Sequence, residues 1–184
     1  MSVAAKPLLA HRFFFALRPD EVTARRTHAF AEQQFGEKGL LRADHLHITL
    51  AITEDFDQPF EGVIERLLQA GASVAAPPFE VVLDRLSASS RSVALRPEHV
   101  LPPLRTLQSR IVEAMDRERI DMRAGWAFSP HQTLIYRSGT PFSRPVELFR
   151  WQAREFLLIH SFVGQTKHEI LGRWQLEDRQ YRLL

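Results

Sequence analysis

The stretch HITLAIT, residues 47–53, combines strand-forming apolar residues with an imidazole and a hydroxyl. Side chains at positions i and i+2 of a β-strand point to the same face. His47 and Thr49 therefore share one face, while Ile48 and Leu50 share the other and can enter a core. The pattern predicts a half-buried strand that carries a polar pair on a rigid support, where a precise site is best built.

A second stretch, HQTLIYR at 131–137, has the same His-x-Thr-Leu order. Here His131 and Thr133 share one face, and Gln132 and Leu134 point the other way. A lone His-x-Thr triplet is more typical of a structural histidine. Two triplets in equivalent surroundings favour a catalytic pair.

The two triplets lie 84 residues apart (131 − 47), and each follows a strand and a helix. The first pass runs from Phe13 through a helix at 20–35 to the first triplet. The second pass runs from Val93 through a helix at 100–119 to the second triplet. The order strand–helix–strand therefore occurs twice along the chain.

This repetition predicts one bilobal domain over 1–184, with halves at about 11–88 and 89–176 as an internal structural repeat. We expect an α+β fold of two pseudo-symmetric lobes, in which antiparallel sheets are flanked by helices. Both triplets would face a central cleft between the lobes.

The rest of the pattern adds shorter elements. We expect a helix at 59–71 that stops at Gly71, a hairpin near Ser89, a proline-containing loop at 138–145, and late strands at 154–162 and 168–176.

The composition is that of an ordinary soluble protein, with 45% apolar and 25% charged residues and a net charge of +2. The absence of cysteine excludes disulfides and thiolate metal sites. His11 and Arg12 interrupt the apolar N-terminal stretch, which argues against a signal peptide. No apolar run is long enough for a membrane span. We expect a cytoplasmic monomer.

Arginine dominates the basic residues, since Lys6, Lys38 and Lys167 are the only lysines among the 24 cations. The planar guanidinium suits phosphate recognition. A GC-rich genome would give the same bias, so both explanations stay open.

Two imidazoles that face one cleft suit a reaction in which one proton is removed and another is delivered near neutral pH. The hydroxyls of Thr49 and Thr133 can donate hydrogen bonds to non-bridging phosphate oxygens. Together these groups predict an in-line displacement at phosphorus that needs no metal and no cofactor. The spacing does not tell which histidine is the acid and which is the base.

Metal binding is the alternative for the first triplet, because His45, His47 and Thr49 would lie on one strand face. Histidine metal sites usually assemble three or more ligands. The first carboxylate after His47 is Glu54, and no second ligand stands beside His131. We therefore expect no metal here, and His45 would tune His47 or be exposed.

Several segments resemble the two-histidine (2H) phosphoesterases, and within them the RNA 2′,3′-cyclic phosphodiesterases, also called 2′-5′ RNA ligases. The segments are RFFFALRP at 12–19, LHITLA at 46–51, SPHQTL at 129–134, FLLIHS at 156–161 and LGRWQL at 171–176. The resemblance covers nearly the whole chain, from about Arg12 to Leu176, and its paired H-x-T-x motifs are fairly specific.

The resemblance implies metal-independent hydrolysis of a terminal RNA 2′,3′-cyclic phosphate to a 2′-phosphate, with reversible 2′-5′ ligation as a related activity. It implies that His47 is the proton donor to the leaving 3′ oxygen and that His131 is the proton acceptor that activates water. Thr49 and Thr133 would hold the phosphate. The expected partner is an RNA or nucleotide with a 2′,3′-cyclic phosphate end.

The chain also departs from the family pattern. The family often has arginine two residues before and five residues after the second histidine, where this chain has Ser129 and Tyr136. Arg137, at an even offset from His131, would share its face in an unbroken strand and restore the charge, or it is a surface arginine. His168 stands where relatives often have tyrosine.

Other candidates for substrate binding are Arg123 and the aromatic residues Tyr136 and Phe128, either of which could stack on a base. Aromatic residues beside strands are more often part of a core.

Two alternative functions stay open. One is a 2H phosphodiesterase that acts on a small nucleotide, such as an ADP-ribose cyclic phosphate or a 2′-5′ oligonucleotide. The other is a non-catalytic module that binds a nucleotide or RNA.

Overall fold

The computed structural model describes residues 10–177 of the chain. Its elements in order are β1 (His11–Leu17), α1 (Glu21–Phe35), the 3-10 turn η1 (Ala43–His45), β2 (Ile48–Ile52), α2 (Glu61–Ser73), β3 (Phe79–Ala88), β4 (Ser92–Arg96), α3 (Pro102–Arg117), β5 (Gln132–Tyr136), β6 (Phe142–Ala153), β7 (Glu155–Phe162) and β8 (Lys167–Gln175). None of the helices in this part of the chain combines the length and the apolar character that a membrane crossing requires.

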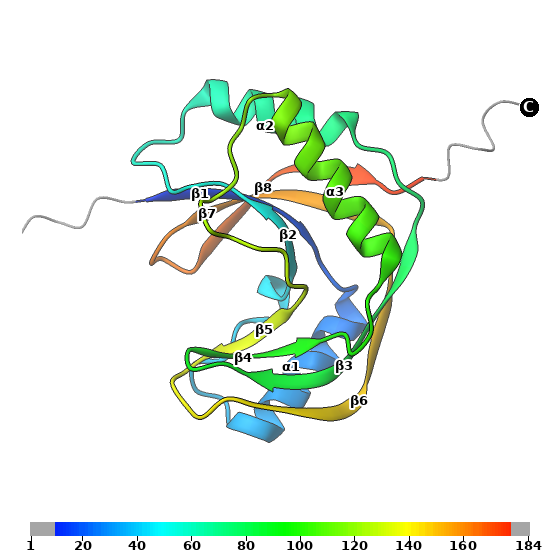
Figure 1. The fold of residues 1–184 in the computed structure, drawn as a ribbon. Helices are drawn as coiled ribbons and strands as arrows, with labels where there is room; N and C mark the ends of the chain where they lie inside the picture. The colour runs from blue at the N-terminus through cyan, green and yellow to red at the C-terminus, as the bar shows by residue number, and fades with distance from the viewer. Residues whose placement is uncertain (1–9, 178–184) are drawn as a thin grey trace, which may run out of the picture.

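The strands form one antiparallel sheet of eight strands in the order β6-β3-β4-β5-β2-β1-β7-β8. The sheet curls, so that β1, β2, β7 and β8 lie above β3, β4, β5 and β6 (Figure 1). The two halves join where β2 pairs with β5, through the residue pair Ile48 and Gln132. The predicted α+β class is confirmed, with the sheets of the two lobes continuous with each other.

The spatial halves do not follow the halves of the sequence. The lower half takes β3 from the first part of the chain, and the upper half takes β7 and β8 from the last part. The internal repeat over 11–88 and 89–176 stays a prediction.

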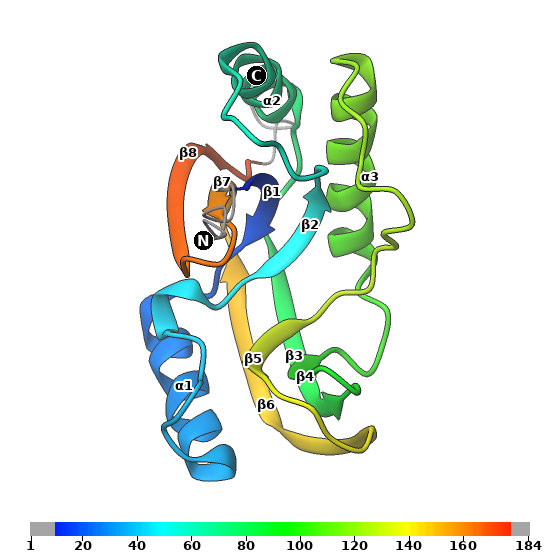
Figure 2. The same ribbon diagram turned by 90° about the vertical axis from the view of Figure 1, so that its left-hand side faces the viewer.

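Helices α1 and α3 each pack on the half of the sheet that their own strands do not belong to. Helix α1 connects β1 to β2, yet Phe30 packs on Phe149 of β6 with 5.1 Å between the ring centroids. Helix α3 connects β4 to β5 but lies beside α2 at the upper end of the molecule (Figure 2). The two crossings tie the halves together.

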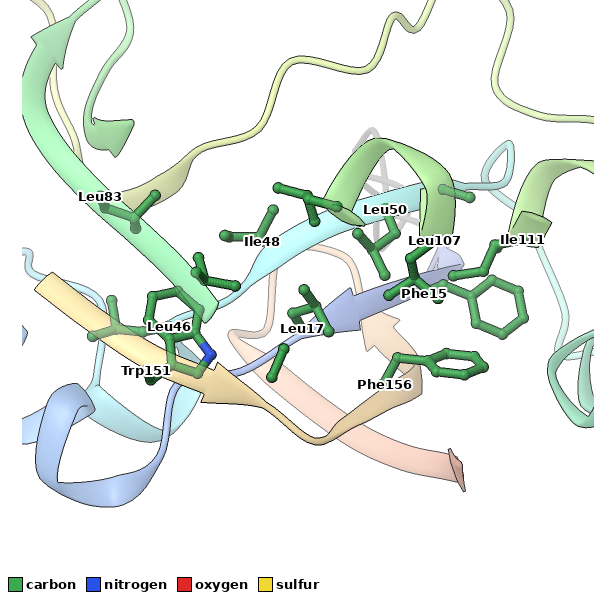
Figure 3. Packing of buried hydrophobic residues seen from close by; sticks show 14 of the residues in the cluster. Phe15, Leu17, Leu46, Ile48, Leu50, Leu83, Leu107, Ile111, Trp151 and Phe156 are labelled. Carbon is green, nitrogen blue, oxygen red and sulfur yellow. The ribbon is translucent and has the colours of Figure 1, made fainter. Parts of the chain in front are cut away.

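The core lies between the sheet and these helices. Leu107 and Ile111 of α3 point toward Leu50 of β2 and Phe15 of β1 (Figure 3), and all four side chains are buried. Apolar residues at helical spacing on α3 supply this face, as the periodicity predicts. The core therefore fixes β1 and β2, which carry one half of the site.

Helix α1 begins at an aspartate N-cap and ends at a glycine. The Asp20 side chain accepts a hydrogen bond from the backbone N–H of Thr23, which caps the first turn. Gly36 follows the last residue with φ 76°, a backbone conformation that favours glycine.

Two elements differ from the sequence-based expectation. Of the segment expected to be a loop at 138–145, the first half is irregular as predicted, but residues 142–145 belong to β6, and Pro145 lies inside that strand. Proline is tolerated there because β6 is an edge strand, whose outer N–H groups need no partner. The strand after the second helix begins at Gln132, so the residues before it approach the sheet as an irregular segment.

Helix α2 also differs, because it continues through Gly71 to Ser73. Gly71 does not stop the helix but makes room for Trp174 of β8. A Cβ at position 71 would lie 2.4 Å from Trp174 Cη2. The indole is itself held by Phe156, with the two rings stacked at 5.2 Å.

We expect Gly71→Ala to lower the free energy of unfolding by about 1–3 kcal/mol, the usual cost of overpacking. Gly62→Ala in the same helix is the matched control, because a Cβ there has no neighbour within 4 Å. The control should gain up to about 1 kcal/mol from better helix propensity. Denaturant unfolding of the two variants measures the difference. Equal stability of both variants would contradict the packing assigned to Trp174.

Candidate functional site

Four adjacent strands bring the two His-x-Thr triplets together. Across β4, β5, β2 and β1, Leu95 pairs with Gln132, Gln132 with Ile48, and Ile48 with Leu17. These four residues form one row across the sheet and all are fully buried on the core face. The residues one position to either side of this row therefore point to the opposite face, away from the core.

Continuing the registers by one residue places two further rows on that opposite face. The first row reads Arg96, His131, Thr49, Ala16. The second row reads Ala94, Thr133, His47, Arg18. Each histidine therefore lies next to the threonine of the other triplet, and each has an arginine on its outer side. The triplets form one cluster, as the sequence pattern predicts.

A β-bulge follows each triplet at the same place. The β1–β2 register shifts at Leu50, and the β4–β5 register shifts at Leu134. At each bulge two successive residues enter the core: Leu50 with Ala51, and Leu134 with Ile135. The strand then returns its next residue to the face of the histidines.

The second bulge decides where the residues after the triplet point. Ser92 pairs with Tyr136 and Ala94 with Thr133, so Tyr136 shares the face of Thr133. Arg137 is thereby turned to the opposite face, where its guanidinium lies 4.5 Å from the centroid of the Phe35 ring. The prediction that Arg137 shares the face of His131 assumed an unbroken strand. The bulge at Leu134 interrupts the strand, so Arg137 points to the opposite face.

The two imidazoles are held in the same way. His47 Nδ1–H donates to the carbonyl oxygen of His45 at 2.7 Å. His131 Nδ1–H donates to the carbonyl oxygen of Ser129, also at 2.7 Å. A carbonyl can only accept, so each Nδ1 carries the proton, and each Nε2 is left for proton transfer.

The surroundings of both histidines favour the neutral form. The pKa of His47 is lowered to about 4, mainly by burial and in smaller part by the neighbouring Arg18 and His131, while the His45 carbonyl opposes the shift. Burial also lowers the pKa of His131, with Arg96 adding to the effect against the Ser129 carbonyl. Both groups can therefore accept a proton once an anion is bound beside them.

A cavity of about 550 Å³ adjoins the cluster on the His47 side. Its wall includes His47, Thr49, Phe14, Ile52 and, from the other half of the sheet, Tyr136. The Phe14 ring stacks on the His47 imidazole with 4.9 Å between the centroids. The cavity is large enough for a nucleoside and offers apolar and aromatic surface to it.

Two further histidines, His45 and His168, line the same cavity. His45 belongs to the 3-10 turn η1 rather than to the strand. Its ring stacks on His168 of β8 at 4.6 Å. Burial lowers the pKa of His168 to about 3, and its Nδ1 has no hydrogen-bond partner among residues 10–177. His45 and His47 therefore do not project from one strand face as the metal alternative required.

Among residues 10–177, no group of three or more His, Cys, Asp or Glu side chains is arranged to hold a metal ion.

The two remaining predicted residues, Arg123 and Phe128, do not line the cavity. Arg123 is paired with Asp55 and lies 3.7 Å from Glu54, so its charge is already matched by carboxylates. Phe128 packs against the main core and is not part of the cavity wall. Arg12, which the sequence did not single out, does line the cavity and shares Asp55 with Arg123.

Sequence reasoning also missed Arg18 and Arg96, which flank the two histidines. A signal for them was present, because the tetrapeptide ALRP occurs at 16–19 and again at 94–97. The repeat places an arginine at the same position of β1 and β4 relative to the triplets.

Comparisons with known proteins bear on the family and the fold of the chain. A family model described as the 2′-5′ RNA ligase superfamily matches residues 17–160. The structure of LigT of Escherichia coli in complex with 3′-AMP is 26% identical, with a TM-score of 0.74 and coverage of 92% of this chain and 99% of that chain. The protein TT0787 of Thermus thermophilus is 23% identical, with a TM-score of 0.68 and coverage of 91% and 99%. A sequence comparison with curated proteins gives no significant match.

We expect His47 to titrate near pH 4 in the free protein, because burial disfavours the imidazolium. Inorganic phosphate should raise this pKa, since an anion beside the ring stabilises the charged form. NMR titration of the imidazole nitrogens, with His47→Gln to assign the signal, measures both values. An ordinary pKa of about 6.5 in the free protein, or no response to phosphate, would contradict the site described.

Proposed function

The chain belongs to the 2′-5′ RNA ligase superfamily, and on that premise we propose that it hydrolyses an RNA 2′,3′-cyclic phosphate to a 2′-phosphate. Membership supports an enzyme with phosphodiesterase-type activity. The observation that carries the finer proposal is the pair of imidazoles, each with Nδ1–H bound to a carbonyl, on one face of adjacent strands.

The phosphate would lie over the four-residue cluster of His47, Thr49, His131 and Thr133. Strands in a sheet are about 5 Å apart, so groups on β2 and β5 can reach opposite sides of one phosphate. The threonine hydroxyls would donate to the non-bridging oxygens, whose negative charge grows in the transition state. No step requires the protein to supply a metal ligand.

The position of the cavity supports different roles for the two histidines. The cavity adjoins His47, and its wall includes neither His131 nor Thr133. A nucleoside held there would carry its 3′ oxygen toward His47. Water would then approach phosphorus from the His131 side, opposite the leaving oxygen, as an in-line displacement requires.

The reaction then balances with two proton transfers. His131 Nε2 takes a proton from water as the new oxygen–phosphorus bond forms. The 3′ oxygen–phosphorus bond breaks, and the 3′ oxygen takes a proton from His47 Nε2. The bound phosphate anion raises the pKa of His47 above its low value in the free protein, so that the imidazolium is available.

The base and ribose would contact Phe14 and Tyr136, which line the cavity from opposite halves of the sheet. Tyr136 is 70% exposed, which leaves its ring free to stack on a base. Arg12 lies in the same wall, where Asp55 holds its guanidinium. The existence of a complex of E. coli LigT with 3′-AMP supports a nucleotide as the ligand.

Reversible 2′-5′ ligation is a second candidate, favoured by the description of the matching superfamily. The chemistry differs only in the nucleophile. A 5′-hydroxyl would replace water at His131, and the product would be a phosphodiester instead of a 2′-phosphate.

The test is hydrolysis of a short RNA that ends in a 2′,3′-cyclic phosphate, with EDTA present. We expect the wild-type protein to form the 2′-phosphate, and His47→Ala and His131→Ala each to lose about 100- to 10,000-fold in kcat, the usual share of an acid or base. Full activity in either variant would reject the paired-histidine mechanism. Loss of wild-type activity in EDTA would favour a metal hydrolase.

Tyr136→Ala and Arg137→Ala form a matched pair for the same assay. Tyr136 faces the cavity, whereas Arg137 lies on Phe35, so the first variant should raise KM and the second should leave it within about twofold. The opposite result would make Arg137 the residue that binds the substrate, as an unbroken strand would have it.

A further inference from the structure

The two ALRP segments put a cation beside each histidine. Arg18 ends the row next to His47, and Arg96 ends the row next to His131. The proposed proton transfers use neither arginine. In the described residues, 10–177, neither guanidinium is paired with a carboxylate within 4.0 Å.

Arg96 has a contact that links it to the base. Its Nη1 donates to Ser129 Oγ at 2.8 Å. The carbonyl of the same Ser129 accepts the hydrogen bond from His131 Nδ1–H at 2.7 Å. Ser129 therefore touches both the arginine and the histidine, and it lies in the irregular segment that leads into β5.

We propose that Arg96 is the positioning residue of His131, which it orients through Ser129 and keeps neutral by its adjacent positive charge. The side chain of Ser129 is exposed and would move without an anchor. With the anchor in place, its carbonyl fixes the tautomer and direction of the imidazole, so that Nε2 faces the phosphate. The predicted effect on catalysis rests on the proposed function, whereas the predicted effect on the titration of His131 does not.

The charged groups around His131 are few and come from known elements. His47, which directly precedes β2, lies in the neighbouring row and interacts with it. Burial is the main cause that lowers the pKa of His131, and the charge of Arg96 on β4 lowers it as well. Near Arg96, Glu98 is bound by Arg85 at 3.0 Å and so does not neutralise it. His99 and Arg105 line the adjoining cavity with Arg96.

The His47 half of the site has no equivalent of the bond from Arg96 to Ser129, so Arg18 beside His47 provides a control. His45 occupies the position equivalent to Ser129, and Arg18 Nε is buried without a hydrogen-bond partner among the described residues. Arg18→Gln therefore removes a matching charge beside His47 but leaves the bond from Arg96 to Ser129 intact.

The sign of the effect on titration follows from the charges. A cation near His131 opposes its protonation, so removing Arg96 should raise the pKa of His131. Protonated His131 cannot act as a base, so the variant would need a higher pH to reach its full rate. A role in packing alone would not move this titration.

The experiment is NMR titration of the His131 imidazole nitrogens in the wild type, Arg96→Gln, Arg96→Lys, Ser129→Ala and Arg18→Gln. We expect Arg96→Gln to raise the pKa of His131, and Arg96→Lys to leave it near the wild-type value because the charge is kept. Ser129→Ala keeps the charge and the carbonyl, so it should change the pKa less than Arg96→Gln does. Arg18→Gln should shift His47 instead of His131.

Kinetics on the cyclic-phosphate RNA complete the test. Arg96→Gln should lower kcat by about tenfold to 100-fold, because it loses both the anchor that places the base and the charge beside it. Ser129→Ala loses the anchor alone and should show a smaller loss, with KM little changed in both. An unchanged His131 titration in Arg96→Gln, or a rise in KM alone, would overturn the proposal. If the wild type itself does not hydrolyse the RNA, the proposed function fails while the titration still tests Arg96.

Discussion

The pairing of β2 with β5 through Ile48 and Gln132 is the contact on which the rest of the site depends. It joins the two halves of the sheet and sets the register between the two triplets. A shift of this register by one residue would turn one histidine into the core, because strand side chains alternate between faces. The buried row from Leu95 to Leu17 opposes such a shift, since all four of its residues are fully buried.

The bulges at Leu50 and Leu134 give each strand two functions at once. Before the bulge, the strand presents a histidine and a threonine to the cluster. After the bulge, Ile52 and Tyr136 return to the same face and help to form the cavity wall. The same irregularity therefore builds the core, the proton-transfer groups and the substrate surface.

The sequence predicted the paired triplets and the alternation around them, because both follow from the two-residue period of a strand. The sequence did not predict to which face of the sheet Tyr136 and Arg137 point. Their direction depends on the bulge at Leu134, which forms by pairing with β4 and has no recognisable motif in residues 135–137. Arg96 was missed for a similar reason: it comes from the neighbouring strand. It brings a cation to Ser129.

The central claim is that both histidines act on one phosphate. A crystal structure of the protein with inorganic phosphate bound tests it most directly. The account predicts a single anion within hydrogen-bonding distance, about 2.6–3.2 Å, of His47 Nε2 and His131 Nε2, with both threonine hydroxyls donating to it. An anion that touches only one of the two imidazoles, or that binds away from both, would contradict the claim.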